Sequence, residues 1–473
     1  SPAGAAHRRG AARVARLRIL DGGTARPEAE NSADAGDDED QEIALHLQSM
    51  PDPPAPTLVR HGNSATARAE RLARIEYSGP VLASVSALAS AQHAFDALTE
   101  ADLRRRQSAK WKVYGDDVLP AWVAEMDFPI AEPIRRALHA AIDAEDVGYA
   151  DPRGLGNAAA PWALASWRWA IAPGDVHMVA DVVTGIGEVL RVATAPGDAV
   201  LIEPPVYHPF SAVTRHNGRV VVEAPLRLRD GAYAPDLDAI ERAYASGARV
   251  HLLCSPHNPS GMAYSEAELA RIAELADHHR VLVISDEIHA PLTLRGATHR
   301  PFPSVSAAAA RCSIVMTSAS KTWNLAGLKA AMMIACGERG RTELAKLPPD
   351  TPYHAGHLGV LASRAALSEG QPWLTSTLTI LERNRALLGE LLAEHLPRVR
   401  WQPQRAGYLA WLDCRELGLG DDPARAFLQR GKVALSSGPM FGEQGKGFAR
   451  LNVATSRGLL EEAVRRMARA LEG

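Results

Sequence analysis

The sequence has few cysteines, and they form no metal-binding or redox motif. Four occur in 473 residues, they are widely spaced, and no CxxC pair is present. This usage indicates reduced thiols in a cytoplasmic protein, and it predicts no metal site. Three of the four lie inside apolar runs, where core packing is the usual role. The four are Cys254, Cys312, Cys336 and Cys414.

Long hydrophobic runs and a strong excess of one charge are also missing. No apolar stretch approaches the roughly 20 residues that span a bilayer, so no membrane segment is predicted. The formal net charge of −3 predicts no general attraction to nucleic acid or to anionic membranes. With 46% hydrophobic and 23% charged residues, the chain is typical of globular proteins. Its length predicts two folded lobes plus additional sequence.

The first part of the chain differs in composition from the rest. It opens with an Ala- and Arg-rich stretch, which an acidic block at residues 34–42 and a proline-rich stretch follow. No sustained apolar periodicity appears before about Val81, and such segments rarely bury enough apolar surface to fold. Residues 1–90 are therefore predicted to be mostly disordered.

Downstream of about residue 176, short apolar runs alternate with helix-like windows. The runs are rich in β-branched residues, and the windows have the periodicity of amphipathic helices. This alternation predicts an α/β fold with a mostly parallel sheet covered by helices on both faces. The runs lie at residues 177–183, 198–205, 219–226, 249–256, 280–288 and 312–320.

Polar side chains follow these runs, at the points where the strands would end. Ligands of open parallel sheets bind beyond the carboxyl ends of the strands. The sequence therefore predicts that an aromatic ring, an amide, a carboxylate, an imidazole, two hydroxyls and an amine face one crevice. They belong to Tyr207, Asn258, Asp286, His289, Ser318, Ser320 and Lys321.

Each of these residues also has a structural explanation when it is taken alone. Lys321 fits a surface lysine on a strand-to-helix loop, and the NPSG around Asn258 fits a common turn. Asp286 fits a helix N-cap, His289 fits a packed or surface histidine, and Tyr207 fits a loop wall. These explanations leave the joint placement at successive strand ends unexplained.

A lysine beside a carboxylate, an amide and a phosphate-binding edge suits pyridoxal 5'-phosphate (PLP). The lysine amine forms a Schiff base with the cofactor aldehyde, and a carboxylate keeps the pyridine nitrogen protonated so that the ring is an electron sink. An amide can donate to the ring oxygen, and an aromatic side chain can stack on the ring. Hydroxyls, a cation and the amides of a helix N-terminus suit the phosphate. The candidates for the phosphate are Ser318, Ser320, Lys329, Val182 and Val183.

Four motifs, in order along the chain, carry a resemblance to a known family. CSPHNPSG, ISDEIH, TSASKTWN and GFARLNVA together resemble the fold-type I aminotransferase superfamily. Within it, DEIH with SxSKxxN, WVAEMDF at residues 122–128 and YLAWLD at residues 408–413 are similar to the cystathionine β-lyase branch, the MalY/PatB-type C–S lyases. The resemblance covers roughly residues 95–473.

The resemblance implies a large domain with a mostly parallel, seven-stranded-type sheet between helices and a smaller α+β domain. The expected boundaries are an N-terminal segment at 91–140 that packs on the small domain, a PLP-binding large domain at 141–350, and a small domain at 351–473. A homodimer is also expected, because Tyr149 matches a tyrosine that reaches the phosphate of the neighbouring subunit's cofactor. A core aromatic is the alternative for Tyr149.

The resemblance further implies a role for each candidate. Lys321 is the Schiff-base lysine and proton shuttle, and Asp286 pairs with the pyridine nitrogen. Asn258 hydrogen-bonds the ring oxygen, and Tyr207 stacks on the ring. Arg450 grips the substrate carboxylate with its planar fork, although a salt-bridged surface arginine is the alternative. Two further residues depart from typical aminotransferases, which carry tyrosine and a phosphate-binding arginine at these positions. They are His289 and Lys329.

The leading interpretation is β-elimination at a sulfur-bearing amino acid, such as cystathionine or a cysteine S-conjugate, through a Lys321 aldimine. The products are a thiol, pyruvate and ammonia. An aminotransferase is the runner-up, because both reactions share the same early steps. A non-catalytic regulator is a third alternative, but no helix-turn-helix pattern precedes the core.

Overall fold

The computed structural model describes residues 93–472. The prediction of disorder for residues 1–90 lies outside these described residues. The described residues belong to one compact unit. In the described part of the chain, no helix is both long and apolar enough to cross a membrane.

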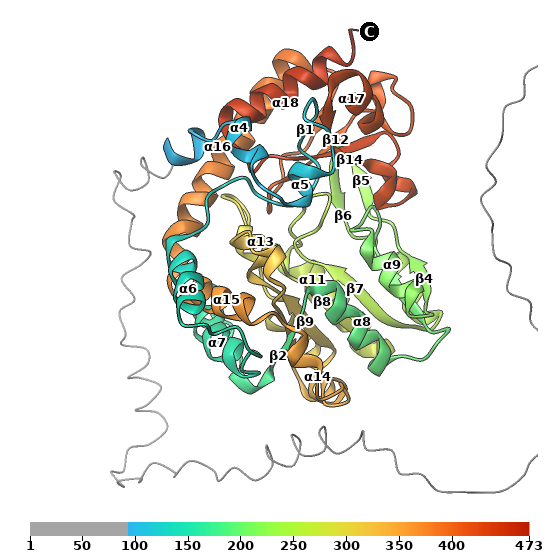
Figure 1. Ribbon diagram of the computed structural model, residues 1–473. Coiled ribbons are helices and arrows are strands. Elements are labelled where there is room, and N and C mark those ends of the chain that lie inside the picture. The colour runs from blue at the N-terminus through green and yellow to red at the C-terminus, as the bar shows by residue number, and fades with distance from the viewer. Residues whose placement is uncertain (1–92, 473) are drawn as a thin grey trace, which may run out of the picture. The chain divides into compact units, whose positions relative to one another are not determined.

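A seven-stranded sheet forms the centre of this unit (Figure 1). Five neighbouring strands run parallel, and β10 runs antiparallel to both strands beside it. The predicted mostly parallel sheet is therefore confirmed. In spatial order the strands are β2 (Val176–Val179), β10 (Ala331–Ala335), β9 (Ser313–Thr317), β8 (Leu282–Asp286), β7 (Ala248–Cys254), β3 (Ala199–Ile202) and β4 (Val220–Glu223).

Alternate residues of the central strands pack against helices on opposite faces of the sheet. Val200 belongs to the same buried cluster as α8 (Val182–Ala193). Its neighbour Leu201 belongs to the cluster of α10 (Leu237–Ala245) and α11 (Glu266–His279) on the other face. Because successive side chains of a strand point to opposite faces, burial on both faces explains the continuous apolar runs of the sequence.

A second, antiparallel sheet lies in the C-terminal part of the chain, with long helices packed beside it (Figure 1). Its strand order is β11-β12-β15-β14. The helix-like windows at 377–396 and 457–473 overlap its two long helices, which end at His395 and Arg469. The elements are β11 (Arg400–Trp401), β12 (Leu409–Asp413), β14 (Ser436–Ser437), β15 (Phe448–Asn452), α16 (Gln371–His395), α17 (Pro423–Gly431) and α18 (Arg457–Arg469).

The N-terminal segment reaches this C-terminal region. β1 (Leu119–Pro120) pairs in parallel with β13 (Val433–Ala434), and Ala121 N donates to Ala434 O at 2.9 Å. The chain then enters α6 (Glu132–Asp143), which packs against α15 (His357–Glu369). The division at residues 140 and 350 stays a prediction.

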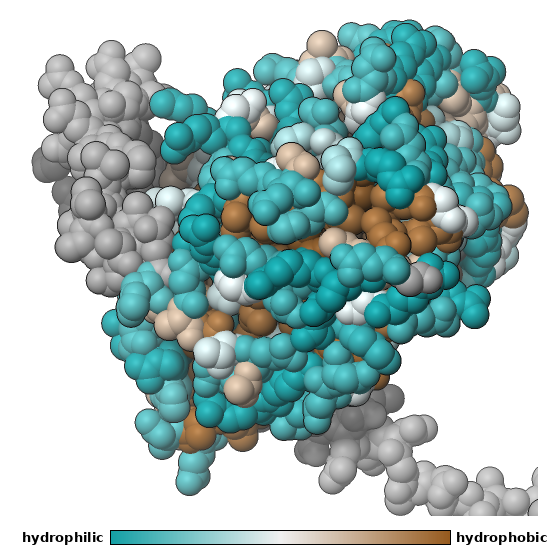
Figure 2. All heavy atoms as spheres, turned by 90° about the horizontal axis from the view of Figure 1, so that it is seen from above, coloured by the Kyte–Doolittle hydropathy of each residue, from teal (hydrophilic) through white to brown (hydrophobic). Residues whose placement is uncertain are grey.

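Seen from above, the surface is mostly hydrophilic, and hydrophobic residues gather near the middle of that face (Figure 2).

The remaining elements connect these layers. The connecting elements are α4 (Glu100–Arg104), α5 (Ala109–Lys112), α7 (Gly154–Trp167), α9 (Pro209–His216), β5 (Arg227–Arg229), β6 (Ala232–Ala234), α12 (Ala307–Arg311), α13 (Ala319–Thr322) and α14 (Glu338–Leu344).

Candidate active site

A pocket of about 500 Å³ lies beyond the carboxyl ends of the central strands. The structure brings all of the predicted site residues except Tyr149 to its wall. A larger cavity of about 920 Å³, beside the β5–β6 hairpin, contains none of them. The predicted residues in the smaller pocket are Val182, Val183, Tyr207, Asn258, Asp286, His289, Ser318, Ser320, Lys321, Lys329 and Arg450.

Lys321 lies on the short helix α13, directly after β9. Ser318 caps this helix, because its hydroxyl accepts from Ser320 N at 3.0 Å and donates to Ala330 O at 2.7 Å. The Lys321 amine donates to Ala124 O at 3.0 Å. Burial, together with the nearby Arg450 charge, lowers the pKa of Lys321 to about 8. A substantial fraction of this amine is therefore neutral near pH 8 and can act as a nucleophile or base.

Asp286 is the last residue of β8 and is 4% exposed. Its Oδ1 accepts from Ile288 N at 3.1 Å. Burial raises the pKa of Asp286 to about 7, against a smaller opposing effect of that backbone bond and of the Lys321 charge. A cationic hydrogen-bond donor would stabilise the ionised form of this buried carboxylate, and a protonated pyridine nitrogen is such a donor.

Arg450, on β15, is 6% exposed and is held by neutral groups. Its Nη1 donates to Asn258 Oδ1 at 2.8 Å, and its Nη2 donates to Ser436 Oγ at 3.0 Å and to Trp122 O at 3.2 Å. The guanidinium carbon lies 4.8 Å from the centroid of the Phe441 ring. Burial lowers the pKa of Arg450 to about 10. A buried cation that is bonded to neutral groups and borders a pocket suits a ligand carboxylate.

His289 and Tyr207 are neutral groups of the pocket wall. Burial lowers the pKa of His289 to about 3, and within the described residues its Nδ1 has no hydrogen-bond partner. Burial raises the pKa of Tyr207 to about 12, so its hydroxyl keeps its proton. The Tyr207 ring is held edge-on to Phe210, with centroids 6.0 Å apart.

Asp181 is the N-cap of α8, and its side chain was not among the predicted site residues. Asp181 Oδ1 accepts from Thr184 N at 2.8 Å, and its Oδ2 pairs with Lys329 Nζ at 3.0 Å. Lys329 is thus neutralised by this carboxylate. The hydroxyl proton of Ser318 is also engaged, at Ala330 O. Phosphate contacts at this end of the pocket stay predictions.

Tyr149 lies outside the pocket on the protein surface. It is 85% exposed, and its ring lies edge-on to Tyr353 with centroids 6.0 Å apart. The alternative of a core aromatic is therefore wrong, and so is a salt-bridged surface arginine for the buried Arg450.

The sequence prediction missed several residues of the pocket wall. The only signal was the WVAEMDF motif at residues 122–128, which was used for the family resemblance and not for the site. Asp181 is the N-cap of α8, Ser436 lies on β14, and Met440 and Phe441 lie in the turn after β14. The missed residues include Trp122, Val123, Ala124, Asp181, Ser436, Met440 and Phe441.

Residues 125–467 match the model of the family described as "Aminotransferase class I and II". The chain belongs to this family. A Mycobacterium leprae protein named "Putative cystathionine beta-lyase" is 44% identical over 79% of this chain and 97% of that protein. "Cystathionine beta-lyase PatB" of Bacillus subtilis is 37% identical over 77% and 97%. A solved Corynebacterium diphtheriae structure, titled a "putative plp-dependent beta-cystathionase", superposes with a TM-score of 0.75, 35% identity and coverage of 80% and 98%.

These similarities confirm the cystathionine β-lyase branch, the fold-type I architecture and the cofactor PLP. This member of the aminotransferase class I and II family is a PLP-dependent carbon–sulfur lyase. Its pocket also fits PLP on its own geometry. Among the described residues, it contains a buried carboxylate without an ion-pair partner, an unpartnered imidazole nitrogen and an amine of lowered pKa, on Asp286, His289 and Lys321.

Proposed function

We propose that the protein cleaves the Cβ–S bond of a sulfur-bearing amino acid, such as cystathionine or a cysteine S-conjugate, to yield a thiol, pyruvate and ammonia. The observation that carries the proposal is the convergence of three groups on one pocket: the Lys321 amine, the Asp286 carboxylate and the Arg450 guanidinium. Elimination needs a base, a partner for the electron sink and an anchor for the substrate carboxylate, and these groups fit those three tasks.

Each of these groups has a defined task in this reaction. When bound, PLP supplies an electron sink for negative charge that develops at the substrate α-carbon. Arg450 binds the substrate α-carboxylate, which fixes the α-carbon relative to Lys321. Lys321 Nζ then takes the α-proton as a general base. Asp286 would accept a hydrogen bond from the protonated ring nitrogen of the cofactor, and its buried position would keep water away from that contact.

The remaining steps follow from the electron balance. The electron pair released at the α-carbon forms a Cα–Cβ double bond as the Cβ–S bond breaks, and the sulfur leaves with its electron pair as a thiolate. The three-carbon fragment is hydrolysed to pyruvate and ammonia. The lowered pKa of Lys321 allows its amine to collect the α-proton near neutral pH.

The test is a panel of amino acids given to the purified holoenzyme. We expect pyruvate and thiol from cystathionine and from cysteine S-conjugates, and none from the Lys321→Ala variant. An aminotransferase would instead convert a supplied 2-oxo acid into its amino acid. Amino transfer without release of pyruvate or thiol would contradict the proposed elimination.

We also propose that the protein acts as a homodimer in which Tyr149 completes the neighbouring subunit's site. Its 85% exposure and the 64% exposure of Val147 beside it support a role in an interface. Mixing Lys321→Ala with Tyr149→Ala subunits tests this idea, because a heterodimer regains one intact site. With random exchange of subunits, about half of the dimers are heterodimers with one intact site of two, so about a quarter of the wild-type activity should return. No recovery after proven subunit exchange would contradict the shared site.

We place the enzyme in the cytoplasm and divide it into the segments 91–140, 141–350 and 351–473. The four free cysteines support a reducing compartment. The pairing of β1 with β13 supports an N-terminal segment packed on the small domain. Cell fractionation tests the location, and limited proteolysis at about residues 140 and 350 tests the boundaries.

A further inference from the structure

A loop at residues 122–127, called the strap below, forms part of the pocket wall. Two of its backbone carbonyls accept hydrogen bonds from the two cations of the proposed mechanism. Ala124 O accepts from Lys321 Nζ at 3.0 Å, and Trp122 O accepts from Arg450 Nη2 at 3.2 Å. The strap therefore contacts the proposed base and the proposed carboxylate anchor at the same time.

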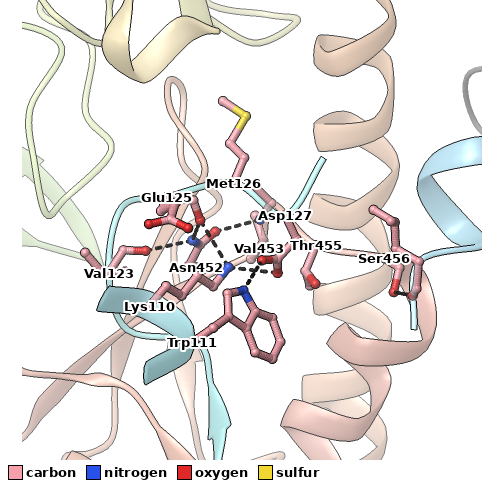
Figure 3. Close-up of polar contacts among 12 residues, drawn as sticks. Lys110, Trp111, Val123, Glu125, Met126, Asp127, Asn452, Val453, Thr455 and Ser456 are labelled. Carbon is pink, nitrogen blue, oxygen red and sulfur yellow. Dashed lines mark hydrogen bonds and ion pairs between the residues drawn. The ribbon is translucent and has the colours of Figure 1, made fainter. Parts of the chain in front are cut away.

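A buried ion pair holds one end of the strap (Figure 3). Lys110 Nζ lies 2.8 Å from Asp127 Oδ2, and the two side chains are 1% and 2% exposed. Lys110 Nζ also donates to Glu125 O at 3.1 Å, while Trp111 Nε1 donates to Asp127 Oδ1 at 3.0 Å. Because the aspartate has both a cation and an indole N–H as partners, this end of the strap has one defined position.

Two asparagines hold the strap between its ends. Asn452 Nδ2 donates to Val123 O at 2.8 Å and to Glu125 O at 2.7 Å (Figure 3). Asn324 Oδ1 accepts from Met126 N at 2.8 Å, and its Nδ2 donates to Met126 O at 2.9 Å. In the absence of a regular sheet, side chains thus satisfy the strap carbonyls.

Asn324 connects the strap to the segment that carries Lys321, three residues earlier. Its backbone has φ +61°, a conformation that asparagine tolerates and glycine adopts freely. Asn452 lies on β15 two residues after Arg450, which donates to the opposite end of the strap. The same two segments that carry Lys321 and Arg450 therefore also carry the two asparagines that hold the strap.

We propose that the strap is a positioning element of the active site, and that the Lys110–Asp127 pair and Asn324 fix the carbonyls that orient Arg450 and Lys321. This inference rests on the proposed function. None of the clamping residues lines the pocket, so they act through the strap and not on the substrate. Their loss should weaken substrate binding through Arg450 and slow proton transfer through Lys321, while the rest of the fold persists.

Two variants and a matched control test the proposal in the holoenzyme. Asn324→Gly removes both bonds to Met126 and keeps the positive φ. Lys110→Met with Asp127→Asn removes both buried charges and keeps an acceptor for Trp111. The control is Lys432→Met, because the Lys432–Asp117 ion pair is similar in length, 3.1 Å, but is 54% and 61% exposed.

The first readout is amide hydrogen exchange of peptides covering the strap. The second is the affinity for L-alanine, measured by the absorbance change of the bound cofactor. Alanine has the α-carboxylate but no β-leaving group, so its binding does not depend on lyase activity. We expect both strap variants to show about tenfold faster strap exchange and about tenfold weaker alanine binding, with unchanged exchange in α16. The control should match the wild type in both.

The outcomes separate this inference from the proposed function. Faster strap exchange with unchanged alanine affinity would make the clamps purely structural and overturn the proposal. Unchanged exchange in Asn324→Gly would overturn it as well, even if the double variant failed to fold. A wild type that releases no pyruvate would remove the proposed lyase reaction, but the exchange and alanine measurements would still decide the role of the strap.

Discussion

The chain contains two sets of one lysine and one aspartate in buried or half-buried positions, and the sets differ in how their charges are satisfied. Lys110 and Asp127 pair at 2.8 Å and are almost fully enclosed. Lys321 donates to a backbone carbonyl, and Asp286 accepts from a backbone N–H. The pKa of Lys321 is lowered to about 8 and that of Asp286 is raised to about 7, because burial favours the neutral form of each.

The difference shows that the role of a buried ionisable group depends on whether it has a partner of opposite charge. A buried charge with an opposite charge and further hydrogen bonds is satisfied inside the protein, and its role is to fix the structure. A buried ionisable group without such a partner is poised to bind a ligand or to move a proton. A change in the first set is expected to lower stability and to affect the active site only through the strap, whereas a change in the second set is expected to affect reactivity directly.

The largest effect is expected from Lys321→Ala. Because Lys321 Nζ is both the proposed base and the amine expected to hold the cofactor, kcat/KM for elimination should fall by at least about 10³-fold. The visible absorbance band of the lysine-bound cofactor should disappear. The free energy of unfolding of the apoprotein should not fall, because the variant removes a buried cation that has no carboxylate partner. Spectroscopy, pyruvate assays and urea unfolding measure these changes, and Lys432→Ala is the control.

Asp127→Ala tests the paired set. It leaves the Lys110 ammonium buried without its partner, so the free energy of unfolding should fall by about 3 to 5 kcal/mol. Replacing both residues, with Lys110→Met and Asp127→Leu, should cost clearly less, since no buried charge remains. Urea unfolding of the three proteins measures both costs. Equal costs for the single and the double variant would contradict the comparison.

Asp286 makes a specific contribution to the pH dependence of the apoprotein. Its pKa is about 7 in the folded state and 3.8 in the unfolded state, so the folded state binds the proton more tightly. This contribution is fully present below about pH 4 and is lost as the pH rises through 7. The Asp286→Asn variant lacks this contribution. The difference in free energy of unfolding between the two proteins should therefore change by at most about 4 kcal/mol between about pH 4 and a pH above 7. Parallel pH profiles of unfolding would refute the raised pKa.

The smallest expected effect belongs to Arg450→Lys. Arg450 is buried and well hydrogen-bonded, as Lys110 and Asp127 are, but its acceptors are neutral, as that of Lys321 is. Lysine keeps the charge and loses the planar fork, so KM for the amino acid should rise about 10- to 100-fold. A smaller change is expected in kcat. Steady-state kinetics with pyruvate detection separate the two parameters, and a change confined to kcat would argue against an anchoring role.

The sequence allowed the central sheet to be predicted where both faces of a strand are buried. Strand β10 was not predicted, because its run AMMIA has one β-branched residue. Its extended conformation is stabilised by antiparallel pairing with β2 and β9. The pairing with β2, which is far away in the sequence, leaves no local pattern.

The candidate site could be predicted for the residues that follow strands, because the sheet brings the strand ends together. The strap could not be predicted in this way. Lys110 and Asp127 lie 17 residues apart in a segment with little regular structure, and nothing in the local pattern indicates that they meet. Asp181 was also missed as a side chain, because its pairing with Lys329 joins residues 148 positions apart.

The bond between Trp122 and Arg450 joins residues that are 328 positions apart. During synthesis at about 5 to 20 residues per second, the early partner emerges roughly 15 to 65 seconds before the late one. Trp122 O therefore gains its bond from Arg450 only after β15, the last strand of the described residues, has been made. A nascent chain that lacks β15 already has Lys321 and its contact at Ala124 O, but it has neither Arg450 nor Asn452, so competence for the reaction comes only after β15 is complete.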